Sequence, residues 1–154
     1  MHSFRLARQA DLAAIIGLLA DDDLGSAREI VADPIDPRYL SAFAAFAAIE
    51  ADANQMLAVA SDADGQVVGC LQLSFIPGLS RTGMWRGQIE SVRIARDLRG
   101  SGLGSEFIEW AIVQCAERGC GLVQLTSDKT RTDSIRFYEK LGFVASHEGL
   151  KRSL

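Results

Sequence analysis

The sequence holds few of the residues that covalent and metal-dependent catalysis require. Its two histidines, His2 and His147, lie near the two ends of the chain. A serine or cysteine nucleophile needs a base beside it, and neither histidine falls near a motif. No Cys or His pair has the spacing that is typical of zinc ligands. We therefore expect neither a covalent enzyme intermediate nor a bound metal.

Disulfides are not indicated either. The three cysteines, Cys70, Cys115 and Cys120, are an odd number without a secretion signal, which favours reduced thiols. Cys70 falls inside an expected strand and Cys115 on the apolar side of an expected helix, so we expect both in the core. Cys120 lies near the next turn, where we expect partial exposure.

Long apolar runs and an excess of positive charge are missing as well. No run is long enough to span a bilayer, and no charged segment followed by an apolar one opens the chain. The net charge of −4 argues against nucleic acid or an anionic membrane as the main partner. We expect a cytoplasmic protein whose 154 residues, which show no internal repeat, form a single domain over 1–154.

What the sequence does contain is a strand, a glycine-rich turn and a helix between residues 88 and 118. Ile89 and Val92 supply the β-branched bulk of a strand, and residues 105–118 carry apolar side chains at helical spacing. Three glycines lie between them: Gly100, Gly102 and Gly104. Glycine lets the backbone approach an anion closely, and the free N–H groups at a helix start point at it. The segment therefore suits a phosphate, although a glycine-rich loop without a ligand has the same composition.

Two well-known phosphate motifs do not fit this turn. The dinucleotide pattern GxGxxG would need glycine at Ser105 or Phe107, and no Gly-Lys-Ser/Thr tripeptide occurs. The turn instead contains Arg99-x-x-Gly102-x-Gly104. This pattern resembles the Arg/Gln-x-x-Gly-x-Gly signature of the GNAT superfamily of N-acetyltransferases, whose members bind acetyl-CoA through its pyrophosphate.

Residues 133–143 resemble the other familiar GNAT segment, a helix that ends in Tyr-x-x-x-Gly-Phe. Here the motif residues are Tyr138, Gly142 and Phe143. The two segments occur in the order and at the separation that are usual in the family, so each supports the interpretation of the other. Residues 84–90 and 125–129 are also similar to a bacterial subgroup that is described only as GNAT acetyltransferases.

The remaining elements follow from periodicity and turn residues. We expect a strand over 4–7, helices from Asp11 and over 38–51, and strands over 55–61 and 66–75 joined by a hairpin turn. After the central strand and helix we expect a strand over 121–127, a helix over 132–141 and a last strand over 143–146. The order β-α-α-β-β-β-α-β-α-β matches the GNAT fold. It implies an α/β (α+β) fold with a mixed, mostly antiparallel central sheet and helices on both faces.

The resemblance implies acetyl-CoA as the co-substrate. Main-chain amides of the turn would hold its pyrophosphate, and the Arg99 side chain would add a charge-assisted contact. Pantetheine would lie along residues 92–94, where parallel strands splay, with the Val92 N–H as an oxyanion donor; judged without the family, these amides would simply pair with the next strand. Arg131 replaces a family asparagine and either touches the phosphates or belongs to a solvated basic surface. The residues assigned to the cofactor are Val92, Arg93, Ile94, Arg99, Gly100, Ser101, Gly102, Leu103, Gly104, Ser105 and Arg131.

Tyr138 is the candidate general acid. A phenol titrates at about 10 and a thiol at about 8.5 in water, so at neutral pH a tyrosine within reach of the leaving thiolate still holds a proton that it can give to the sulfur. The apolar spacing of Ile135, Tyr138 and Leu141 fits a core tyrosine as well.

Glu90 is the candidate general base. It precedes Val92 by two positions, so a regular strand would place both side chains on one face, near the thioester. A structural pairing of Glu90 with Arg93 or another cation is the alternative. Gln88 shares that face and would position the amine or a water molecule.

The acceptor is less defined. The resemblance places it between residues 21–39 and the loop 76–86. The first segment carries acidic residues that suit a cationic amine: Asp21, Asp22, Asp23, Glu29, Asp33 and Asp36. The second carries Arg81, Trp85 and Arg86, which suit a carboxylate or an aromatic face, though a solvated surface explains these charges equally well.

We expect an acetyl-CoA-dependent N-acetyltransferase that acts on a small-molecule amine or a protein amino group by direct attack. The alternative is a catalytically weak acyl-CoA-binding module that senses the cofactor or regulates a partner. A homodimer is plausible because such dimers are common among soluble proteins.

Overall fold

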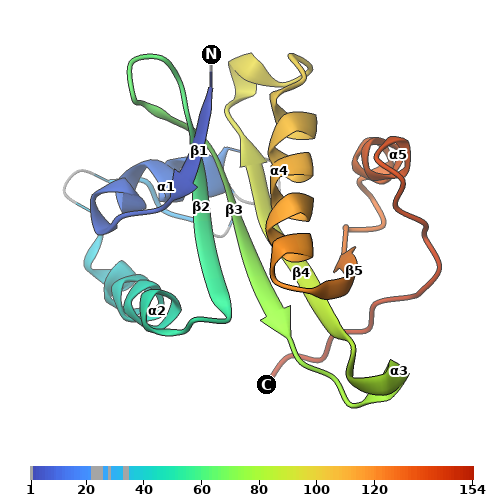
Figure 1. Ribbon diagram of the computed structural model, residues 1–154. Helices are drawn as coiled ribbons and strands as arrows, with labels where there is room; N and C mark the ends of the chain where they lie inside the picture. Colours follow the sequence, from blue (N-terminus) through green and yellow to red (C-terminus); the bar gives the residue numbers. More distant parts are fainter. Residues whose placement is uncertain (1, 22–25, 28, 33–34) are drawn as a thin grey trace.

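A five-stranded sheet forms the centre of the computed structural model, which describes residues 2–21, 26–27, 29–32 and 35–154 (Figure 1). The strands lie in the order β1-β2-β3-β4-β5. The first four are antiparallel neighbours, and β4 pairs with β5 in parallel, so the predicted mixed, mostly antiparallel sheet is confirmed. The strands are β1 (Ser3–Leu6), β2 (Gln55–Ser61), β3 (Val67–Ile76), β4 (Trp85–Ile94) and β5 (Cys120–Leu125).

The long helices begin and end within a few residues of the predicted limits. The helices are α1 (Leu12–Ala20), α2 (Leu40–Ala51), α3 (Ser80–Gly83), α4 (Leu103–Glu117) and α5 (Thr132–Lys140). Short 3₁₀ turns precede three of them: η1 (Gln9–Asp11), η2 (Pro37–Tyr39) and η3 (Arg96–Leu98). The segment expected to be a plain loop between β3 and β4 contains α3, a single turn in which Arg81 and Thr82 have positive φ.

The predicted last strand over 143–146 is wrong. The described residues 141–154 contain no strand, and Val144 is 81% exposed. Phe143, whose apolar side chain suggested the strand, packs edge-on against Tyr138 with ring centroids 5.8 Å apart. The apolar side chain of Phe143 therefore packs against the end of α5 and does not begin a new strand.

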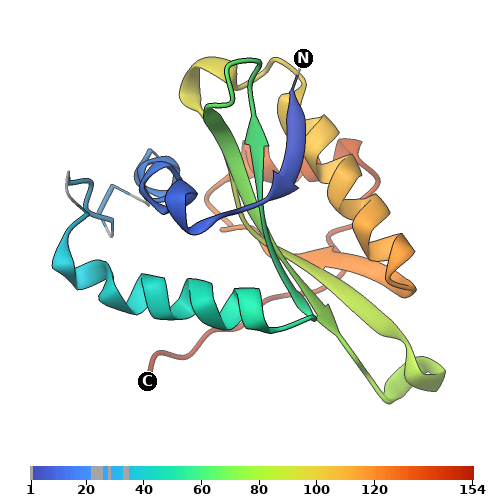
Figure 2. The same ribbon diagram turned by 60° about the vertical axis from the view of Figure 1, so that its left-hand side comes forward.

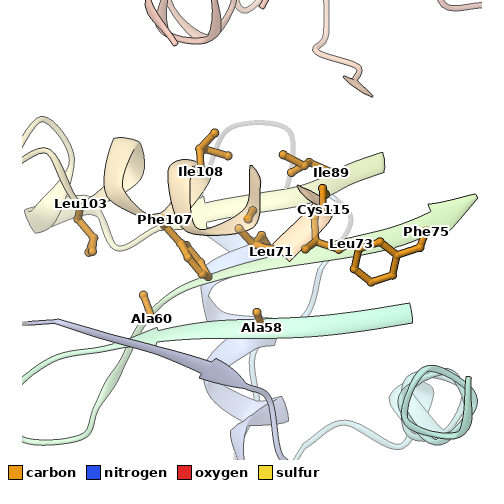
Figure 3. Packing of buried hydrophobic residues seen from close by; sticks show 11 residues of the cluster. Ala58, Ala60, Leu71, Leu73, Phe75, Ile89, Leu103, Phe107, Ile108 and Cys115 are labelled. Atoms are coloured by element: carbon orange, nitrogen blue, oxygen red, sulfur yellow. The ribbon is translucent and has the colours of Figure 1, made fainter. Parts of the chain in front are cut away.

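Helices cover both faces of the sheet (Figure 2). On one face α4 packs against the odd-numbered side chains of β3, and the buried cluster includes Leu71, Leu73 and Phe107 (Figure 3). On the other face α1 contributes Ile15 and Leu18 to a cluster with Val59 and Cys70. Alternation along the strands thus supplies two apolar surfaces, as a sheet with two covered faces requires.

The close approach of α4 to β4 depends on Gly87. A Cβ atom at this position would lie 2.3 Å from the Sγ atom of Cys115. Cys115 and Cys70 are buried, as predicted, and Cys120 is half-buried. Burial raises the pKa of the Cys115 thiol to about 11 and that of Cys70 to about 12. These two thiols therefore stay protonated at neutral pH and act as packing groups.

Candidate active site

The pairing of β4 with β5 ends halfway along β4. The parallel ladder joins Trp85 to Cys120 and ends where Ile89 faces Leu125. Antiparallel pairing with β3 continues on the other side of β4 as far as Ile94. Within the described residues, the half of β4 from Glu90 onward therefore has a strand partner on one side only. Its other edge presents main-chain groups that a ligand can approach.

A β-bulge begins at the same point. The register passes from Glu90 opposite Gln72 to Arg93 opposite Cys70, so Ser91 and Val92 together face Leu71. Ser91 has a φ of +54°, which lies in the left-handed region and is costly for a residue with a Cβ atom. Bulges of this kind re-aim side chains and are common beside active sites.

The bulge overturns one expectation about Glu90. Ile89 and Val92 both pack against the cluster under α4, although they are three positions apart. Glu90 faces Gln72 on the opposite side of the sheet. Glu90 and Val92 therefore do not share a strand face, because Ser91 shifts the alternation by one residue.

Glu90 is exposed on the face that also carries Gln72 and Gln88. The alternative of a structural pair with Arg93 is not supported, because Glu90 makes no ion pair or hydrogen bond in the part of the chain that the structure describes. Gln88 accepts a hydrogen bond of 2.7 Å from Nε2 of Gln124 on β5. The carboxylate of Glu90 thus remains available to a ligand beside the unpaired half of β4.

The glycine turn leads directly into α4. Gly100 and Gly102 have φ values of +82° and +97°, and a Cβ atom at either would meet nothing within 4 Å. The Leu103 N–H reaches only the Ser101 hydroxyl, at 3.4 Å. The structure gives no hydrogen-bond partner, among the residues it describes, to the following amides: Gly100, Gly102, Gly104 and Ser105.

These amides lie at the first turn of a helix of 15 residues. The aligned peptide dipoles place about half a positive charge there. Unpaired N–H groups, positive potential and open space at one point are the features of an anion site.

Arg99 joins the turn to the end of α1. Its Nη2 donates to the main-chain oxygen of Asp21 at 2.7 Å and to the Asp21 carboxylate at 3.1 Å. Its Nε donates to the Ile94 oxygen at 3.1 Å. Arg96 donates to the same carboxylate. The Arg99 guanidinium thus anchors the turn, and its contact with a phosphate stays a prediction.

The Tyr-x-x-x-Gly-Phe segment is the C-terminal cap of α5. Gly142 has a φ of +86°, and its N–H bonds to the Glu139 oxygen at 3.0 Å. The Phe143 N–H bonds to the Tyr138 oxygen at 3.1 Å. These two bonds and the contact of Phe143 with Tyr138 form a Schellman motif, which needs glycine at the left-handed position. The motif therefore fixes where Tyr138 lies.

Tyr138 is half-buried at the margin of the main core and packs edge-on against Phe137, with ring centroids 5.1 Å apart. Burial raises its pKa, and the positive charges of Arg131 and Arg93 offset part of that rise. The ring is thus a packing group, while two cations stand near enough to stabilise a phenolate. Phe137 lies 3.5 Å from the position of a Cβ at Gly104, which links α5 to the start of α4.

The segment that precedes α2 forms a shallow hollow of about 640 Å³. Tyr39 donates to the Glu29 carboxylate and accepts from the Ile30 N–H, both at 2.7 Å. No hydrogen bond or ion pair among the described residues joins Glu29 or Tyr39 to Glu90 or Tyr138. The acids predicted for this segment at Asp22, Asp23 and Asp33 lie outside the described residues.

The described ranges contain no group of three or more His, Cys, Asp or Glu residues that could hold a metal ion. None of their helices has the length and apolar character needed to cross a membrane.

A family model described as the Acetyltransferase (GNAT) family matches residues 20–143. The chain belongs to this family. The matched range contains both motif segments, so the GNAT resemblance noted from the glycine turn and the α5 cap is confirmed.

Two curated relatives are N-acetyltransferases of small amines. The chain is 30% identical over 91 residues to aminoalkylphosphonate N-acetyltransferase of Salmonella typhimurium, covering 59% of this chain and 58% of that protein. It is 36% identical over 90 residues to glucosamine 6-phosphate N-acetyltransferase of Trypanosoma brucei brucei, covering 58% and 59%. The matches thus span about three fifths of each relative.

A solved structure from Bacillus halodurans C-125, described as a transcriptional regulator, resembles the whole chain. It is 45% identical with a TM-score of 0.94, and the match covers 100% of both chains. This GNAT chain therefore has relatives that are described as enzymes and a relative that is described as a regulator.

Proposed function

We propose that this GNAT protein transfers the acetyl group of acetyl-CoA to a primary amine by direct attack, without a covalent enzyme intermediate. One observation carries the proposal. The open amides at the start of α4 follow, after the short turn η3, the half of β4 that has a strand partner on one side only. A strand edge without a partner, followed along the chain by a phosphate site, suits a long coenzyme that has a pyrophosphate and an amide-containing arm.

In this proposal the coenzyme is held mainly by main chain. The open amides within residues 99–105, those of Gly100, Gly102, Gly104 and Ser105, bind the pyrophosphate, and Arg131 at the start of α5 adds positive charge. Pantetheine lies along Val92, Arg93 and Ile94 as an added strand. The Val92 N–H then meets the developing oxyanion, and one such donor contributes about 10²–10³ in rate.

Glu90 and Tyr138 would handle the protons. Glu90 accepts the amine proton, directly or through water, so that a neutral nitrogen attacks the thioester. Tyr138 gives its proton to the departing sulfur. Burial keeps its pKa above the ordinary value, so the phenol is protonated at neutral pH, and Arg131 and Arg93 stabilise the phenolate that forms.

The acceptor would be a small-molecule amine. The two relatives' names specify an aminoalkylphosphonate and glucosamine 6-phosphate, and both are amines. A protein amino group remains the other acceptor class of the proposal.

The test has two steps. Acetyl-CoA should raise the melting temperature, since a ligand that binds only the folded state stabilises it by mass action. Release of free thiol is then followed across a panel of primary amines. Stabilisation followed by amine-dependent thiol release supports the proposal, whereas a melting temperature unmoved by acetyl-CoA contradicts it.

A second function is a catalytically weak acyl-CoA-binding regulator. The Bacillus halodurans protein that favours it is 45% identical over the full chain. Both functions require coenzyme binding, so turnover separates them. Stabilisation by acetyl-CoA with no thiol release on any amine would favour the regulator.

A further inference from the structure

A row of neutral polar side chains crosses the sheet on the face opposite α4. Gln55 faces Ser74, Ser74 faces Gln88, and Gln88 faces Gln124, so the four lie side by side across β2, β3, β4 and β5. We call these four residues the amide belt. Its members bond to one another: Ser74 donates to Gln55 at 2.8 Å and Gln124 to Gln88 at 2.7 Å.

The belt is not saturated. Gln55 Nε2, Gln88 Nε2 and Gln124 Oε1 have no partner within the described part of the chain. These residues are half-buried, and none of the three atoms is among the fully buried polar atoms that lack a partner, so each keeps some contact with solvent. Two donors and an acceptor without net charge suit hydroxyl groups, which both donate and accept.

Two opposite charges lie on β4, one on each side of the amide belt. Arg86, Gln88 and Glu90 follow one another on the same face of β4, because the strand is regular up to the bulge. Arg86 is half-buried, and neither it nor Glu90 makes an ion pair or hydrogen bond with any described residue. Their Cα atoms are about 13 Å apart, as four extended residues require.

An unpaired cation and an unpaired carboxylate on β4, with the neutral belt crossing between them at Gln88, form a template for a ligand. We infer that the acceptor is a hydroxylated primary amine with an anionic group, such as a phosphate, at its far end. The inference rests on the proposed function, because Glu90 places the amine at the thioester. The belt then bonds the hydroxyls, and Arg86 binds the anion with charge-assisted hydrogen bonds.

Four six-carbon primary amines separate these contributions: hexylamine, aminohexyl phosphate, aminodeoxysorbitol and aminodeoxysorbitol phosphate. The phosphate should raise kcat/KM about tenfold to a hundredfold, the range for a hydrogen bond to a charged group. The hydroxyls should add about tenfold. Equal kcat/KM for all four amines would overturn the inference and leave acetyl transfer intact.

Variants assign the effects to residues. Arg86→Gln should erase the advantage of the phosphate and keep that of the hydroxyls, while Arg86→Lys should retain most of both. Arg118→Gln is the matched control, since Arg118 is an exposed arginine at the end of α4, on the opposite face of the sheet. Equal losses in Arg86→Gln and Arg118→Gln would overturn the role of Arg86.

Calorimetry covers the case without turnover. Aminodeoxysorbitol phosphate is titrated into the protein with and without coenzyme A. Binding that Arg86→Gln weakens at least tenfold supports the inference even if no acetyl group moves. No binding in either state overturns it, whereas a missing signal for coenzyme A alone would count against the proposed function and not against this site.

Discussion

The two halves of β4 both pair with β3 but do different things. Trp85 to Ile89 is held by strands on both sides, and Gly87 lets α4 approach closely. Glu90 to Ile94 has a strand on one side, carries the bulge at Ser91 and leads into the glycine turn. A continuous strand can thus build the core with one half and, where pairing on one side ends, offer its main chain to a ligand.

The largest expected effect lies just beyond the second half. Gly102→Asp places a carboxylate among the amides at the start of α4, so the Kd for coenzyme A should rise about a hundredfold or more. Gly65→Asp is the matched control, because Gly65 has a similar φ of +80° in the β2–β3 hairpin. Both changes should cost about 1–2 kcal/mol in stability. Similar Kd values for the two variants, measured by calorimetry, would contradict coenzyme binding at the start of α4.

Tyr138→Phe should lower kcat about a hundredfold, because it removes the proton for the leaving thiolate. The Kd for acetyl-CoA should change little, since the ring and its contacts with Phe137 and Phe143 remain. Burial raises the Tyr138 pKa, so the protonated form persists and the wild-type kcat should fall only above about pH 10. An unchanged kcat would remove Tyr138 from the mechanism.

Glu90→Gln should lower kcat/KM about tenfold to a hundredfold at neutral pH and flatten the acidic limb of the pH–rate profile. The substitution keeps shape and hydrogen bonding but removes the base. Gln72→Glu is the comparison variant, because it keeps Glu90 and adds a second carboxylate opposite it on the same face of the sheet. A variant at Glu90 that retains the acidic limb would show that another group is the base.

Arg99→Gln should weaken coenzyme A binding about tenfold, because the turn loses its bonds to Asp21 and Ile94 and one positive charge. Arg96→Gln is matched, since Arg96 bonds to the same Asp21 carboxylate but lies outside the motif. The Kd of the Arg96→Gln variant for coenzyme A should change by less than about twofold. Equal increases in Kd for the two variants would show that Arg99 contributes only its general positive charge.

The smallest functional effect is expected in the first half of β4. Gly87→Ala forces a Cβ against Cys115, so the free energy of unfolding should fall by about 1–3 kcal/mol. The Kd for coenzyme A should stay within about twofold. Denaturant unfolding and calorimetry on the same variant check both. Lost affinity without lost stability would contradict the division of β4 into two halves.

Local signals predicted much of the backbone geometry of the glycine turn and of the α5 cap. Gly100, Gly102 and Gly142 all have positive φ, and such positions select glycine strongly enough to be seen in one sequence. The cap of α5 also explains why Tyr138 and Phe143 are five residues apart. The same cap misled the prediction of a last strand, because an apolar residue beside a helix end resembles the start of one.

Features that depend on how the strands pair could not be predicted from the sequence. Ser91 adopts positive φ without being glycine, so nothing in the sequence marks the bulge that separates Glu90 from Val92. Arg99 and Asp21 are 78 residues apart in sequence. The amide belt exists only through the register of four strands, which the spacing of single residues does not specify.

The most direct test of the coenzyme site is an amide NMR titration of the uniformly ¹⁵N-labelled protein with coenzyme A. The account predicts the largest shifts at Gly100, Gly102, Gly104 and Ser105, followed by Val92, with little change at Gly87. Shifts spread over other elements while these amides stay unmoved would contradict it.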